Sequence, residues 1–141
     1  MHPGTVFAII AAVSFGLWTV FQERASDFVN TLFGAIVVST TAALIGIALL
    51  LPKIKSTQLY SDSRGLVFAV LAGMCALGID FFALKAYGTG LDVSVGGPII
   101  IGGSVAIAAF VGFLLGESFT LAKLLGLALV IAGSGILASF S

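Results

Sequence analysis

The residue with the clearest chemical potential in this sequence is Asp80, the one carboxylate within the apolar segment 65–90. A helix over residues 65–87, at about 1.5 Å per residue, is long enough to cross a hydrocarbon core of about 30 Å. Asp80 would then lie within about 6 Å of the midpoint of the span. A charged group at that depth is costly, so such residues usually face a helix interface or an aqueous cavity and serve a function. We therefore predict that Asp80 binds a substrate, a cation or a proton.

The spacing of small residues around Asp80 predicts that it faces neighbouring helices. Steps of three and four place one stripe on the same helical face, formed by Ala69, Gly73, Ala76, Asp80, Ala83 and Tyr87. Lys85 lies about 140° around the helix from Asp80, so the two side chains do not pair. An alternative remains open: Asp80 is a structural acceptor for a hydroxyl on another helix and lines no pathway.

Three further residues are candidates for substrate or ion binding, namely Trp18, Tyr87 and Ser104. Trp18 and Tyr87 can supply aromatic contacts, although both residue types also serve as anchors at the membrane interface. A proline in a helix removes a backbone hydrogen bond, so a kink or local opening is predicted at Gly97, Pro98, Gly102 and Gly103. Irregular backbone at membrane depth is tolerated where it lines a cavity, but proline and glycine are also common in ordinary membrane helices.

Composition predicts an integral membrane protein surrounded by lipid. The chain has 141 residues, of which 60% are hydrophobic and 9% charged, and its mean hydropathy is +1.24. No catalytic motif is recognisable, so no enzyme activity and no catalytic residue is predicted. His2 and Cys75 have no partner ligands nearby in sequence, so no metal and no cofactor is expected. The basic residues are scattered, which argues against nucleic acid as a partner.

The predicted fold is all-α, with one transmembrane domain over residues 1–141. Polar or turn-forming connections separate five apolar segments, which predict transmembrane helices at about 4–22, 31–51, 65–87, 93–115 and 120–139. The first helix is expected to leave the membrane at Gln22-Glu23-Arg24. Ser118 or Thr120 is expected to cap the fifth helix.

Five spans place the two termini on opposite sides of the membrane. Four basic residues, Lys53, Lys55, Arg64 and Lys123, lie on the side of the N-terminus, whereas Arg24 and Lys85 lie on the other. This bias favours an N-inside orientation, but it is weak and is also compatible with insertion in both orientations. We expect a multi-pass protein of a prokaryotic plasma (inner) membrane.

The last third of the chain carries the most specific family resemblance. Its features are the proline-bearing fourth helix, the segment Gly112 to Glu117 followed by Thr120, and the glycine-containing apolar start of the fifth helix at 125–133. With nearly the whole chain matching, the sequence resembles one EamA-type half domain of the drug/metabolite transporter superfamily. Members of that superfamily are secondary transporters, commonly built from two five-helix repeats of inverted topology.

The resemblance implies that this single repeat pairs to form a complete transporter. The pairing would be an antiparallel homodimer, as in the related small multidrug resistance proteins, or a dimer with a second half-size subunit. Those proteins use a glutamate in the middle of the first helix, whereas Glu23 here lies near the end of that helix. The coupling role is therefore not transferred to Glu23, and Asp80 is the better-placed candidate.

The predicted function is secondary transport of a small metabolite or drug-like solute by alternating access, with coupling to a proton or cation as an option. The cavity is expected between the first, third and fourth helices. The alternative is a non-transporting membrane subunit, or an accessory protein for lipid substrates, that needs a partner. The sequence does not identify the solute.

Overall fold

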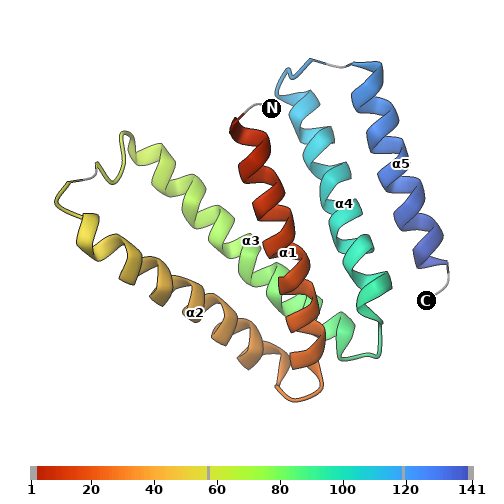
Figure 1. Ribbon diagram of the computed structural model, residues 1–141, viewed down its shortest axis with the longest axis horizontal. Coiled ribbons are helices and arrows are strands. Elements are labelled where there is room, and N and C mark those ends of the chain that lie inside the picture. Colours follow the sequence, from red (N-terminus) through yellow and green to blue (C-terminus); the bar gives the residue numbers. More distant parts are fainter. Residues whose placement is uncertain (1–2, 57, 119, 140–141) are drawn as a thin grey trace.

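The computed structural model describes residues 3–56, 58–118 and 120–139 and is helical throughout its regular parts (Figure 1). Five long helices follow one another along the chain, with one turn of 3-10 helix after the second. Their bounds are α1 Pro3–Ser26, α2 Thr31–Leu50, η1 Leu51–Lys53, α3 Ser63–Tyr87, α4 Val93–Leu114 and α5 Leu121–Ala138. The predicted all-α fold with five spans is confirmed.

Local sequence signals explain where the helices begin. The side chain of Asn30 accepts hydrogen bonds from the backbone N–H groups of Leu32 and Phe33 at the start of α2. Asp62 caps α3 in the same way, and Thr120 caps α5 as expected. Such caps satisfy N–H groups that have no partner within the helix. The turns after α3 and α4 contain Gly90 and Gly116, both with positive φ, a conformation that glycine adopts without strain.

All five helices are long and apolar enough to cross a membrane. The chain is therefore a multi-pass integral membrane protein. Its accessible surface is 10,380 Å², whereas a compact soluble monomer of this mass exposes only about 6,800 Å². Many large apolar side chains are exposed along these helices, as expected of spans that face lipid.

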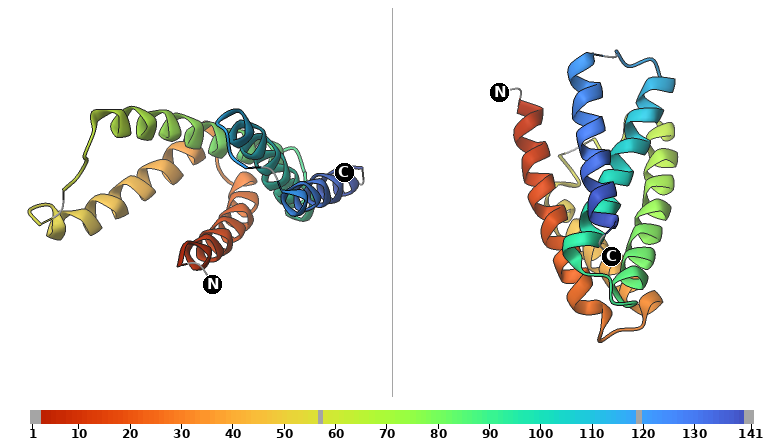
Figure 2. Two further views of the ribbon diagram at one scale, coloured as in Figure 1. Left: turned by 90° about the horizontal axis from the view of Figure 1, so that it is seen from above. Right: turned by 90° about the vertical axis from the view of Figure 1, so that its right-hand side faces the viewer.

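Two ends of the molecule differ in how tightly the helices pack. We define the packed end as residues 18–35 and 80–97. Four parts of the chain converge there, namely the end of α1, the turn into α2, the end of α3 and the start of α4 (Figure 1). We define the splayed end as residues 4–13 and 44–77. There, α2 and α3 move apart as they approach the loop that connects them (Figure 2, left). Every described residue of the splayed end is exposed, whereas most of the buried residues belong to the packed end.

The first helix is longer than the sequence predicts. It continues to Ser26, about one turn beyond the predicted helix end at residue 22. Gln22 is only 2% exposed and donates a hydrogen bond to Asp80 of α3, so this polar residue lies within the protein. Polarity alone cannot distinguish a residue that faces water from one that binds another helix.

Candidate functional site: a buried carboxylate between three helices

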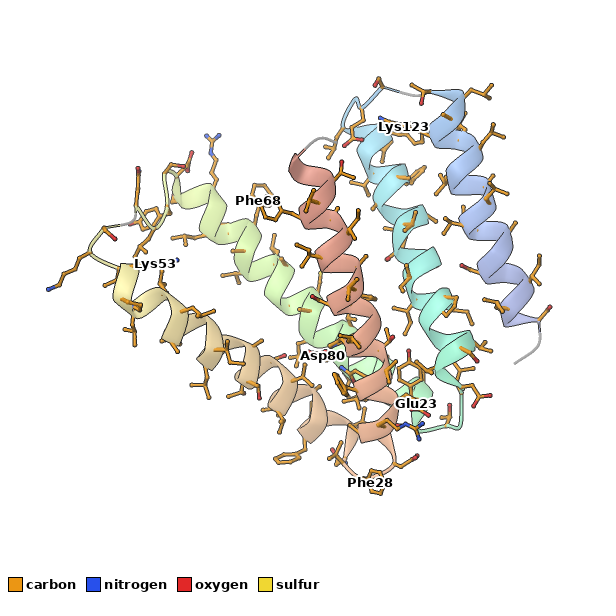
Figure 3. The ribbon with its side chains drawn as sticks, in the orientation of Figure 1. Glu23, Phe28, Lys53, Phe68, Asp80 and Lys123 are labelled. Atoms are coloured by element: carbon orange, nitrogen blue, oxygen red, sulfur yellow. The ribbon has the colours of Figure 1, made fainter. Side chains whose placement is uncertain are left out.

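The Asp80 carboxylate is 6% exposed and accepts three hydrogen bonds from two other helices. Trp18 donates its indole N–H to Oδ1 at 3.1 Å, and Gln22 donates its side-chain amide N–H to the same oxygen at 2.8 Å. Ser39 of α2 donates its hydroxyl to Oδ2 at 3.1 Å. Figure 3 shows Asp80 where α1 crosses α3. A single carboxylate thus joins α1, α2 and α3.

Helical spacing explains how these donors reach Asp80. Trp18 and Gln22 are four residues apart on α1, so their side chains lie one above the other on one face. Ser39 lies in the first half of α2, which begins beside the end of α3. The turn at residues 27–30 reverses the chain and brings this part of α2 next to α3.

The start of α4 closes the site on another side through close approach at two glycines. A Cβ atom at Gly96 would stand 2.6 Å from Cε1 of Tyr87, and one at Gly97 would stand 3.8 Å from Oγ1 of Thr19. Only the absence of a side chain at Gly96 lets α4 pack on the Tyr87 ring. This contact leaves Tyr87 only 2% exposed.

Two buried side-chain atoms next to this network have no hydrogen-bond partner among the described residues. They are Oε1 of Gln22 and the hydroxyl oxygen of Tyr87. A third, Oε2 of Glu23, also lacks a hydrogen bond but lies 3.4 Å from Nε of Arg24. Buried polar atoms without partners are costly, so this region is suited to taking up water or a ligand.

The charge of Asp80 is unbalanced within the described part of the chain. Its three donors are neutral, and the only ion pair there joins Arg24 to Glu23. Buried charges in proteins are normally paired or bound to cations. An ionised Asp80 is therefore a site of unsatisfied negative potential at membrane depth, which a cation or a proton can neutralise. No group of three or more metal-ligating side chains occurs in the described ranges.

Two grooves adjoin this network, and both are bounded by α1, α2 and α3. The Asp80 groove, of about 420 Å³, is lined by residues that include Phe15, Trp18, Ser39, Gly73, Ala76 and Asp80. A second groove of about 580 Å³ runs between α1 and α2 and includes Trp18, Gln22 and Phe33. The sequence predicts a cavity between the first, third and fourth helices, but in the structure α2 takes the place of α4 beside Asp80. The reason is that Ser39 binds Asp80, whereas α4 covers Thr19 and Tyr87.

The predicted site residues do not all meet. Trp18 contacts Asp80 directly, through its indole nitrogen. Tyr87 lies in the last turn of α3, about 10 Å along the helix from Asp80, with its hydroxyl group buried. Ser104 is exposed on α4 and donates its hydroxyl to the Ile101 carbonyl of its own helix. Binding of solute or ion by these four residues stays a prediction.

The helix that was expected to be kinked is continuous from Val93 to Leu114. The Pro98 carbonyl accepts a hydrogen bond from the Ser134 hydroxyl of α5 at 2.9 Å. Gly102 contacts the same Ser134, whereas Gly103 is exposed and faces open space. These contacts tie α4 to α5, and a kink formed by Gly97, Pro98, Gly102 and Gly103 stays a prediction.

Sequence reasoning missed two of the three residues that bind Asp80. Gln22 was interpreted as part of the membrane exit, and Ser39 was not among the candidate site residues. The spacing of Trp18 and Gln22 was the available signal, because an amide four residues from a tryptophan on an apolar helix shares its face. No comparable signal distinguishes Ser39 from other hydroxyl residues in α2.

Comparison with known protein families gives a match over almost the entire chain. The sequence model of the EamA-like transporter family matches residues 2–139. Comparison with curated proteins and comparison with solved structures each gave no match. The five candidate membrane spans fit one half domain of the EamA type. The chain therefore belongs to the EamA-like transporter family.

Proposed function

We propose that this protein is a secondary transporter of a small metabolite or drug-like solute, and that Asp80 is its central binding group. The observation that carries the proposal is a carboxylate, 6% exposed, which three neutral donors hold between α1, α2 and α3 without a cationic partner among the described residues. Placing a carboxylate at membrane depth costs free energy, and such residues usually occur at ion and substrate sites. Membership of a transporter family supports the same reading.

The structural alternative for Asp80 makes a different prediction. A purely structural acceptor would need only its hydrogen bonds, and an asparagine with its oxygen at the Oδ1 position could keep those from Trp18 and Gln22. Its NH2 group, at the Oδ2 position, could donate to the hydroxyl oxygen of Ser39. A binding group needs its charge. Asp80→Asn therefore separates the two readings, because it preserves shape and removes charge.

The transporter is proposed to work as a dimer of two copies in opposite orientations. One chain supplies five spans and exposes far more surface than a compact protein of its mass. Two oppositely inserted five-helix units reproduce an inverted repeat, in which alternating access arises by movement of one unit against the other. The apolar splayed end offers surface for such a second unit, and coupling to a proton or cation would use Asp80.

Transport by the purified protein in liposomes tests the function. The protein would be reconstituted with a pH gradient or a cation gradient and challenged with a panel of labelled amines, amino acids and drug-like solutes. Wild-type protein should move at least one solute, and Asp80→Asn should abolish gradient-driven uptake while its elution profile in detergent stays unchanged. Asp92→Asn is the matched control, since Asp92 is an exposed carboxylate at the start of α4 whose side chain makes no cap hydrogen bond.

Each outcome of this experiment has a clear meaning. Gradient-driven flux that survives in Asp80→Asn removes Asp80 from the mechanism. Liposomes that stay silent with every solute until a second membrane protein is added would instead support the accessory-subunit alternative.

Thiol labelling in intact cells tests the antiparallel arrangement. With Cys75 replaced by alanine, a single cysteine would be placed at Thr89 in the turn of the packed end or at Ser61 near the splayed end. A membrane-impermeant reagent should modify about half of the copies of each variant before permeabilisation. Complete labelling of one variant and none of the other would mean a single orientation, and would redirect the search to a separate partner subunit.

A further inference from the structure

We propose that the Asp80 groove binds an organic cation, with its ammonium group at the Asp80 carboxylate and its apolar part against Phe15 and Trp18. This inference rests on the proposed function and names the chemical class of the solute. It starts from the lining of the groove, which brings the buried carboxylate and an aromatic pair together in one space of about 420 Å³. Pockets for small ligands have volumes of about 300–1,000 Å³.

The carboxylate has capacity left for a ligand. Each carboxylate oxygen accepts about two hydrogen bonds. Oδ1 already accepts two, from Trp18 and Gln22, whereas Oδ2 accepts only the one from Ser39. Oδ2 therefore keeps one lone pair without a donor among the described residues, and this lone pair can attract a cation whether or not the cation carries an N–H group. Ser39, which binds that oxygen, also lines the groove. The neutral donors hold the carboxylate in place without cancelling its charge, which is the arrangement that attracts a cation.

The aromatic side chains suit the apolar and cationic parts of such a solute. The rings of Phe15 and Trp18 pack with their centroids 4.9 Å apart and their planes tilted by 34°. Aromatic faces attract ammonium groups, and the attraction grows when water is excluded. Because Trp18 donates its N–H to Asp80, ring and carboxylate are held at hydrogen-bonding distance from each other. An anion is disfavoured here, since no basic side chain lines the groove.

Small residues of α3 leave room for the solute. Gly73 and Ala76 line the groove, and a Cβ atom at Gly73 would meet no atom within 4 Å. Gly78, on the same helix, also has open space around it, but it lines a different groove that does not include Asp80. A larger side chain at Gly73 should fill the Asp80 groove, and the same change at Gly78 should leave it empty.

The test compares two compounds of equal shape. Benzyltrimethylammonium carries a permanent positive charge, and neopentylbenzene is its neutral isostere. Trp18 is the only tryptophan in the chain and lines the groove, so its fluorescence reports binding directly. Purified full-length protein in detergent would be titrated with each compound, and calorimetry would provide a second, label-free measure of affinity.

Wild-type protein should bind the cation at least about 10-fold more tightly than the isostere, since a close charge pair with little solvent contributes on this scale. Asp80→Asn should reduce this preference to about twofold or less. Phe15→Leu should weaken binding of the cation by about three- to fivefold, the size of a partly desolvated cation–π contact. Asp92→Asn should behave as wild type.

Gly73→Leu keeps the test informative if the Asp80 variant fails to fold, because it leaves every hydrogen bond of Asp80 intact. It should weaken binding of the cation by more than about 10-fold through loss of the groove volume, and Gly78→Leu should have no effect. The proposal is overturned if wild-type protein binds both compounds equally, or if Gly73→Leu and Gly78→Leu bind the cation as wild type does.

Binding and transport are separate readouts. Cation binding that depends on Asp80 in a protein that moves no solute would preserve this inference and contradict the proposed function. Transport of another solute without cation binding would preserve the function and overturn the inference.

Discussion

The packed end and the splayed end of this molecule share α1, α2 and α3, but α4 joins them only at the packed end. At the packed end the helices meet through small and polar residues, such as Gly34 and Gly96, and through the hydrogen bonds of Asp80. At the splayed end, large apolar side chains point outward from α2 and α3, and every described residue is exposed.

The difference shows what holds membrane helices together. Lipid tails are as apolar as leucine side chains, so apolar residues by themselves give helices no reason to associate. Close packing at glycines and hydrogen bonds between helices do give such a reason. The splayed end has neither, and it is therefore the part of the molecule that remains free to contact lipid or a second copy.

The largest difference between the ends should appear when a leucine of α3 is truncated. Leu84 is 2% exposed and touches the position of Gly34, whereas Leu71, on the same helix, is 50% exposed. Leu84→Ala should lower the free energy of unfolding by about 2–5 kcal/mol, because a cavity remains. Leu71→Ala should change it by less than about 0.5 kcal/mol. Unfolding in mixed micelles with increasing SDS measures both, and equal losses would contradict the division into two ends.

A methyl group added to a glycine should have opposite effects at the two ends. Gly96→Ala brings a Cβ atom to 2.6 Å from the Tyr87 ring, and the overpacking should lower the free energy of unfolding by about 1–3 kcal/mol. Gly46 has no atom within 4 Å of an added Cβ, so Gly46→Ala should raise it by up to about 1 kcal/mol through helix propensity. The same SDS titration detects the sign. A stable Gly96→Ala variant would mean that α4 does not pack closely on Tyr87.

Loss of one donor to Asp80 should have a moderate effect. Gln22→Leu removes a hydrogen bond to a carboxylate and also removes the buried, unpaired Oε1 atom. The first change destabilises by about 1.5–3 kcal/mol and the second recovers part of that, leaving a net loss of about 1–2 kcal/mol. Ser14→Ala, an exposed position on the same helix, should be within about 0.5 kcal/mol of wild type. If Gln22→Leu matched Ser14→Ala, the Asp80 network would not stabilise the packed end.

The smallest effect should be the same at both ends. Asn30 caps α2 at the packed end and Asp62 caps α3 at the splayed end, each through its side-chain oxygen. Replacing either with alanine should lower the free energy of unfolding by about 1 kcal/mol, because a cap acts locally. If the two variants lost unequal free energies of unfolding in the SDS titration, tertiary packing as well as the cap would contribute to stability at these positions.

The sequence predicted the helices well because each is a long apolar segment between polar or turn-forming residues. In four of the five helices both boundaries agree with the prediction to within two residues, as for α5 at 121–138 against a predicted 120–139. The error at the end of α1 had a physical cause: Gln22 was assigned to water, whereas it binds Asp80. A polar residue near a helix end can face either water or another helix, and the neighbouring helices determine which of the two it contacts.

By itself, the sequence determined that Asp80 is a carboxylate at membrane depth on a face of small residues, because hydropathy and helical period depend only on residue order. It did not determine which residues would hold that carboxylate. Trp18, Gln22 and Ser39 lie on two other helices, up to 62 residues away in sequence. Their meeting depends on how α1 and α2 cross α3, where Leu84 of α3 lies against Gly34 of α2. Only the tertiary structure places three donors around one acid and leaves a groove beside it.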